Sequence, residues 1–332
     1  MNFKSNKVMV NLFVAALSFG VSIFVNRSVT LDSHSLGISM QEYSKIFPEK
    51  SNILQPHRFL LPLLGKITNL DLQILNLIIL FLFLSIVFQH LNKFQNFSNS
   101  IILTFSLCAT MIVQFHLNFG AYPDILSYFL LLLVFISRNE KVVPYILFFL
   151  ALLVKETNIF TILFFFGLKE ISKIKLTIPV LFYIPIYLNL SIGTYGLNHY
   201  LQPLKNDLLY WISQSTNYIF LGYFSTIKFL WILVFLFIIQ NFKESTPIFL
   251  LMFGISAQFF LGGDTTRFVS FIYLGLLYIF ENIELQKFSK LNLLIFLLNV
   301  FTYKYYVYAY GQMVVINQSK LSFLDFYSLI TQ

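Results

Sequence analysis

Residues 143–168, VPYILFFLALLVKETNIFTILFFFGL, decide how this chain is threaded, because Lys155 and Glu156 interrupt a run that is otherwise mostly apolar. A single helix through this run would hold both charges at mid-depth in a membrane, where a charge is costly. Two short segments that turn at 155–157 would instead return the lysines of 169–175 to the side of the N-terminal lysines. The positive-inside rule favours the turn. Each half spans only about 18 Å of helix, so protein or a wet cavity must shield the pair.

The whole chain has the composition of an integral membrane protein. Of its 332 residues, 58% are hydrophobic and 11% charged, with a mean hydropathy of +0.77. A crossing helix needs about 20 apolar residues to span a hydrocarbon core of about 30 Å. We predict an all-α fold with one polytopic domain, 1–332, and about 11 membrane segments, within a range of roughly 9 to 12. Besides the two halves of 143–168, spans are expected near 8–25, 70–89, 99–117, 124–137, 176–190, 218–240, 246–261, 268–281 and 292–308.

With a turn at 155–157, most Lys and Arg residues of the loops fall on the predicted inner side of the membrane. The predicted inner loops carry 11 Lys/Arg in 43 residues, and the predicted outer ones carry 9 in 111. This contrast predicts a cytoplasmic N-terminus. The basic residues lie singly between apolar runs, so nucleic acid is not an expected partner. The predicted inner loops are 1–7, 90–98, 138–142, 169–175, 241–245 and 282–291.

The unusual charges fall on the predicted outer side. The first outer loop, 26–69, is the longest polar stretch, and three short breaks between apolar runs add further charges. An ionisable group at such a depth is a functional-site hypothesis by default. The candidate residues are Asp32, Glu42, His57 and Arg58 in the first loop, Asp124 after Tyr122-Pro123, the pair Lys155 and Glu156, and the pair Asp264 and Arg267.

Each candidate also has a structural interpretation. Asp124 and Asp264 are suited to cap helices, and Arg267 to reach the membrane interface. The pair at 155–156 would hold a tight turn by neutralising itself. His57 has no metal-ligand spacing and reads as a polar loop residue. Taken together, however, the residues predict a wet, charged cavity in which acids act as bases and cations hold a lipid phosphate.

Four short motifs follow one another on this side of the chain. They are Arg58-Phe59-Leu60-Leu61-Pro62 with Glu42-Tyr43 upstream, Tyr122-Pro123-Asp124, Leu153-Val154-Lys155-Glu156-Thr157, and Asp264-Thr265-Thr266-Arg267. Their order resembles that of the GT-C superfamily of multi-spanning membrane glycosyltransferases, over roughly residues 8–280. The resemblance implies a polyprenyl-phosphate sugar as donor and an acid of the first outer loop near the acceptor.

From the resemblance we expect an enzyme of a bacterial plasma membrane that transfers a sugar to a lipid or glycan acceptor at the extracytoplasmic face. Asp32 or Glu42 would deprotonate the acceptor, and Asp124 would assist or position it. Arg58, Lys155 and Arg267 would bind the lipid phosphate, while His57, Glu156 and Asp264 would orient those cations. No cofactor is expected. A divalent cation among Asp32, Glu42 and Asp124 stays open, although no spacing demands a metal.

Two other functions use the same residues. The first is a transporter, flippase or glycan polymerase that uses the same cavity. A transporter would show pseudo-symmetric halves, and a flippase would expose a charged path to both faces. We find no convincing internal repeat in the sequence. A non-catalytic membrane scaffold would place four residues far apart, each against different neighbours: Asp124, Glu156, Asp264 and Arg267.

Overall fold

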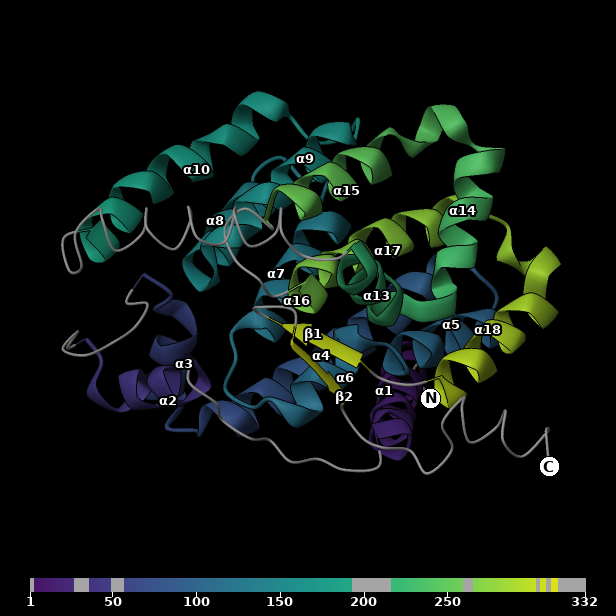
Figure 1. Cartoon of the computed structure of the whole chain (residues 1–332), viewed down its shortest axis with the longest axis horizontal. Coiled ribbons are helices and arrows are strands. Elements are labelled where there is room, and N and C mark those ends of the chain that lie inside the picture. Colours follow the sequence, from purple (N-terminus) through teal and green to yellow (C-terminus); the bar gives the residue numbers. More distant parts are fainter. Residues whose placement is uncertain are drawn as a thin grey trace.

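The computed structural model describes residues 3–26, 36–48, 57–192, 216–258, 265–302, 305–308 and 312–315, and nearly all of them are helical (Figure 1). The α-helices are α1 (Phe3–Asn26), α2 (Leu36–Ile46), α3 (Leu60–Thr68), α4 (Leu72–Phe94), α5 (Phe97–Cys108), α6 (Met111–Asn118), α7 (Asp124–Ile136), α8 (Val143–Val154), α9 (Ile162–Gly167), α10 (Lys173–Tyr187), α13 (Thr216–Ile227), α14 (Trp231–Gln240), α15 (Thr246–Gln258), α16 (Thr265–Val269), α17 (Tyr273–Asn282) and α18 (Ser289–Phe301).

Short turns of other helix types and one small ladder complete the described elements. The two strands pair antiparallel, with Tyr305 opposite Val315 and Tyr308 opposite Gln312. The 3-10 helices are η1 (Glu156–Thr161), η3 (Lys228–Leu230), η4 (Phe242–Ser245), η6 (Ser270–Ile272) and η7 (Leu285–Phe288), η2 (Leu188–Ile192) is a π-helix, and the strands are β1 (Tyr305–Tyr308) and β2 (Gln312–Val315).

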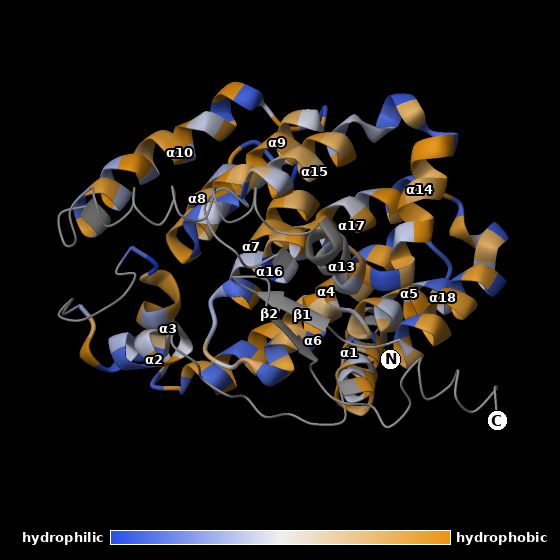
Figure 2. Ribbon diagram, viewed as in Figure 1, coloured by the Kyte–Doolittle hydropathy of each residue, from blue (hydrophilic) through white to orange (hydrophobic). Residues whose placement is uncertain are grey.

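The helices are those of a membrane-embedded protein. Among the described residues, four helical stretches are long and apolar enough to cross a membrane: Val8–Val25, Leu72–Phe94, Lys173–Leu190 and Gly222–Gln240. The pair α5 and α6 makes a fifth if it is one span bent by 50°. The helix bodies are mostly apolar, as Figure 2 shows for α8 and α14. The larger number of about 11 segments stays a prediction.

Two helices near the centre organise the core. α4 packs against α1, α5, α7 and α17, and α7 packs against α4, α8 and α17. Large apolar side chains also cover the outside of the molecule, where Phe24, Ile174, Ile239 and Phe253 are each more than two-thirds exposed. Apolar surface on both the inside and the outside is what a lipid solvent permits.

The chain reverses direction at Lys155, as its sequence predicts. α8 ends at Val154, Lys155 is extended (φ −158°, ψ 121°), and η1 begins at Glu156. The ring of Phe148 lies 5.9 Å from that of Phe165. A continuous helix would separate these residues by about 25 Å, so the segments before and after Lys155 must fold back against each other.

The reversal creates two opposite ends. At the Arg138 end, defined by residues 90–98, 138–142, 169–175, 241–245 and 282–291, the loops contact one another. The Gln95 amide donates to the carbonyl oxygens of Phe280 (2.6 Å) and Ile283 (2.8 Å), and Arg138 Nη2 donates to Glu281 Oε2 (2.8 Å). At the Asp124 end lie the start of α7 and the break at Lys155. The predicted inner loops after the first span therefore share one end.

The first outer loop, 26–69, contains two helices, α2 and α3, which pack together. Two expectations need correction. The span expected at 292–308 ends at Phe301, since the following Tyr-Tyr-Val-Tyr run has the aromatic and β-branched composition that suits a strand. The span expected at 99–117 bends between Cys108 and Met111.

Candidate functional site

Asp124 is the centre of a buried ion-pair network at the Asp124 end. Its Oδ1 accepts a hydrogen bond from Lys155 Nζ at 2.6 Å. Its Oδ2 accepts two from Arg267, at 2.6 Å from Nη2 and 3.1 Å from Nε. Asp124 is fully buried and the Lys155 side chain is 2% exposed. The three charges come from α7, the break after α8 and α16, which are far apart in sequence.

This network overturns the interpretation of Asp124 as a helix cap. The helix begins with Pro123 as its N-cap and no side-chain capping bond, so Asp124 is not a helix cap. Three N–H donors occupy the carboxylate, so it is poorly suited to take a proton from an acceptor. Its role is that of a counter-ion that holds two cations in place.

Glu156 is the centre of a second network beside the first. Its Oε2 accepts a hydrogen bond from Arg58 Nε at 2.7 Å, Arg58 Nη2 donates to its Oε1, and His57 Nε2 lies 3.0 Å from Oε2. The 22% exposure of the Glu156 side chain makes it the more accessible acid of the two networks.

Lys155 and Glu156 join the two networks through one peptide bond but do not neutralise each other. Successive side chains on an extended backbone point to opposite sides. The extended Lys155 therefore reaches Asp124, while Glu156 reaches Arg58. The expected self-neutralising pair is thus wrong. The break itself is held by Asn158, which accepts a hydrogen bond from Ser127 Oγ (2.6 Å) and donates to Ala151 O (2.6 Å).

Aromatic rings surround the cations of the first network. The Arg267 guanidinium lies 4.9 Å from the ring centroid of Tyr122 and 5.6 Å from that of Phe115. Lys155 Nζ lies 5.6 Å from the Phe268 ring. Such cation–π contacts strengthen where water is excluded, so the rings help to keep these charges buried.

Gly37 brings the start of α2 against the same end. A side-chain carbon at this position would lie 2.8 Å from Gly120 O and 3.3 Å from the Tyr122 ring, so only glycine permits this approach. Glu42 lies on the same helix, but its side chain is exposed and it belongs to neither network. Asp32 and Asp264 lie outside the described residues.

Two buried ionisable residues were missed at the level of sequence. His116, on α6, is 1% exposed, and neither ring nitrogen has a hydrogen-bond partner among the described residues. Its ring lies 5.5 Å from that of Tyr128, whose hydroxyl donates to Arg267 O at 3.2 Å. Lys228 is fully buried and donates to the carbonyl oxygens of Ala109 and Asn299. Each lies inside an apolar run, a position that already marks an ionisable side chain as unusual.

A second ionic cluster lies at the Arg138 end. Glu281 binds Arg138 and lies 2.7 Å from His90 Nε2, and Arg138 Nε lies 3.5 Å from Glu170. Within the part of the chain that the structure describes, no group of three or more His, Cys, Asp or Glu side chains is arranged to hold a metal ion.

Six of the nine candidate residues therefore converge, namely His57, Arg58, Asp124, Lys155, Glu156 and Arg267. Largely buried cations that carboxylates hold in place are suited to binding an anion at a fixed position. No protein-family model, curated protein or solved structure matches this chain.

Proposed function

We propose that this protein is a membrane glycosyltransferase that transfers a sugar from a polyprenyl-phosphate donor to a lipid or glycan acceptor, at the extracytoplasmic face of a bacterial plasma membrane. The observation that carries the proposal is the convergence of Arg58, Lys155 and Arg267 with their counter-ions at one end of an apolar helical protein. An anionic head group attached to an apolar chain is the ligand that such a place suits best.

The reaction needs a base and a group that accepts negative charge. The acceptor hydroxyl loses its proton to the base, and its oxygen forms a bond to the anomeric carbon of the sugar. The bond between that carbon and the phosphate oxygen breaks, and its electron pair leaves with the polyprenyl phosphate. Asp32 or Glu42 is the proposed base, because Asp124 and Glu156 are both held by cations.

The cations act on the leaving group. Negative charge grows on the phosphate oxygen as the bond breaks, and donors fixed in advance stabilise that charge without reorganisation. A guanidinium has five N–H donors, of which a carboxylate takes two. Asp124 and Glu156 each hold one arginine, Arg267 and Arg58, in a fixed position, and the contact with Glu156 uses only the Nε and Nη2 donors of Arg58.

The geometry argues against both rivals. A scaffold would scatter the charges, whereas Asp124, Arg267 and the pair at 155–156 adjoin one another. A transporter or flippase needs a polar path between the two ends, which α7 separates by its length of about 20 Å. Ser127 and Tyr128 are buried near the Asp124 end of α7, but the buried residues of the rest of the helix are all apolar, namely Leu130, Leu131, Leu132, Val134 and Phe135.

The test is a transfer assay with the purified protein in liposomes. A panel of polyprenyl-phosphate sugars with labelled sugar is offered together with lipid and glycan acceptors, and the released polyprenyl phosphate is measured beside the labelled product. Arg58→Gln and Arg267→Gln should each lower the rate about 100-fold or more. Arg138→Gln is the matched control, since Arg138 is also a largely buried arginine paired with a glutamate, but at the opposite end.

A binding measurement with polyprenyl phosphate, which carries no sugar, tests the proposed phosphate site whichever sugar the donor carries. The wild-type protein should bind it at least tenfold more tightly than the uncharged polyprenol, because the phosphate is the group that the cations recognise. Equal binding of the two lipids, or equal losses in Arg267→Gln and Arg138→Gln, would overturn the proposal.

A further inference from the structure

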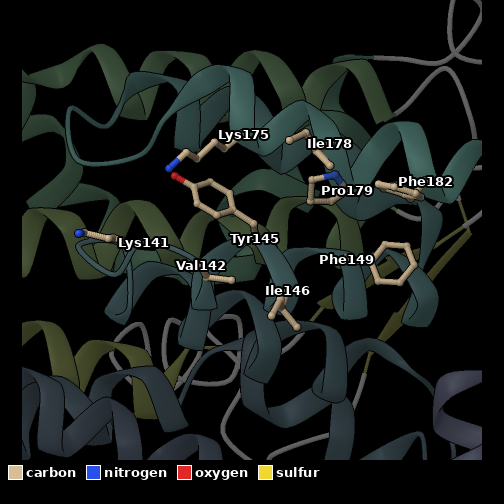
Figure 3. Close-up of a pocket in the computed structure, with 9 residues that line it drawn as sticks. All are labelled: Lys141, Val142, Tyr145, Ile146, Phe149, Lys175, Ile178, Pro179 and Phe182. Carbon is tan, nitrogen blue, oxygen red and sulfur yellow. The ribbon is translucent and has the colours of Figure 1, made fainter.

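An open groove of about 490 Å³ lies between α8 and α10, on the side of the molecule toward the Arg138 end. Its size is within the range of small-molecule sites, about 300–1,000 Å³. Figure 3 shows Lys141, Lys175 and the Tyr145 hydroxyl toward one end of the groove and Phe149 and Phe182 at the other. The remaining lining residues, Val142, Ile146, Ile178 and Pro179, are apolar.

The groove is amphipathic along its length. From Lys175 to Phe182 it follows about 10 Å of α10. On the other side it is lined by Tyr145, Ile146 and Phe149 of α8, with Lys141 and Val142 just before that helix. A length of about 10 Å is roughly a third of a hydrocarbon core of about 30 Å. The groove would therefore lie within one leaflet, on its head-group side. Figure 2 shows the same division on α10, which is hydrophilic at its start and mostly apolar beyond.

The charges at the lysine end favour an anion. The two adjoining loops, 138–142 and 169–175, hold five basic residues and two acidic ones. One of the acids, Glu170, lies 3.5 Å from Arg138, and the other, Glu140, is exposed. The Tyr145 hydroxyl accepts a hydrogen bond from the Ser172 backbone N–H at 3.1 Å, which leaves its own proton for an oxygen acceptor.

We propose that this groove binds an anionic glycerophospholipid of the surrounding bilayer. Its phosphate lies between Lys141 and Lys175, and the upper part of one acyl chain lies on Ile146, Phe149 and Ile178. Basic pockets between membrane helices bind anionic head groups in this way. The site is separate from the Asp124 end, because the length of α8, about 18 Å, lies between Lys141 and Lys155.

The test measures lipid binding to the purified full-length protein in detergent by native mass spectrometry. The probes are dioleoyl-phosphatidylglycerol and dioleoyl-phosphatidylcholine, which share their acyl chains and differ in net charge. Lys141→Gln/Lys175→Gln should weaken phosphatidylglycerol binding roughly 25-fold, since each basic residue near an anionic surface contributes about 1 kcal/mol. Binding of phosphatidylcholine should change little.

Two further variants make the result specific. Lys287→Gln/Lys290→Gln removes the same charge from exposed lysines at the Arg138 end and should leave phosphatidylglycerol binding unchanged. Ile178→Trp fills the groove and should weaken binding of both lipids. An unchanged preference for phosphatidylglycerol in Lys141→Gln/Lys175→Gln would overturn the proposal, as would an equal loss in the control pair. Neither result bears on sugar transfer, which is measured separately.

Discussion

Replacing Asp124 by asparagine should destabilise the protein more than any single replacement of its cationic partners. Asn keeps the shape of the side chain but removes the only acid that Lys155 and Arg267 share among the described residues. Breaking a buried ion pair by removing one partner costs about 3–5 kcal/mol, because the remaining charge stays buried. Two cations remain here, so we expect the upper part of that range.

Lys155→Met provides the comparison. It removes one cation, but Asp124 keeps Arg267, whose two N–H donors already bind Oδ2. The cost should therefore stay below that of Asp124→Asn. The double variant Asp124→Asn/Lys155→Met should lose clearly less stability than the two single variants together. Lys155→Met removes a positive charge that Asp124→Asn alone would leave buried without its carboxylate.

The assay is reversible unfolding of the purified protein in mixed micelles, followed by tryptophan fluorescence as the denaturing detergent increases. Glu284→Gln is a control, because Glu284 forms an exposed pair with Lys287 and should leave the midpoint unchanged. An Asp124→Asn variant as stable as wild type, or a Lys155→Met variant that is less stable than Asp124→Asn, would refute the assignment of Asp124 as the shared counter-ion.

Two further variants test the packing and the second network. Gly254→Ala should lower the free energy of unfolding by about 1–3 kcal/mol, because the added carbon would lie 2.4 Å from Phe160 O. Gly20→Ala, with open space at that position, is its matched control and should be neutral or stabilising, and equal effects of the two would contradict the packing of α15 on η1. Arg58→Lys keeps the charge but loses the two-point contact with Glu156, so polyprenyl-phosphate binding should weaken about tenfold. Unchanged binding would exclude a role for the guanidinium geometry.

The break at Lys155 could be predicted from the sequence alone. Two adjacent charges inside an apolar run are too costly for a plain crossing helix, and the lysines of 169–175 also require a reversal. The same reasoning put Asp124, Arg267 and Lys155 on one side. These conclusions rest on the energetics of charge in a membrane, which depend on composition and order along the chain.

The sequence by itself thus determined a helical membrane protein, its reversal at 155–157 and the set of charges that share one end. Only the tertiary structure decided the pairing: Lys155 with Asp124, Glu156 with Arg58, and His116 without a hydrogen-bond partner among the described residues. It also decided that α18 ends at Phe301 and that α5 and α6 bend. The physical reason is that an ion pair depends on where helices far apart in sequence pack and on which way each side chain points. Neither the packing of distant helices nor the direction of a side chain can be read from hydropathy or from the order of charges along the chain.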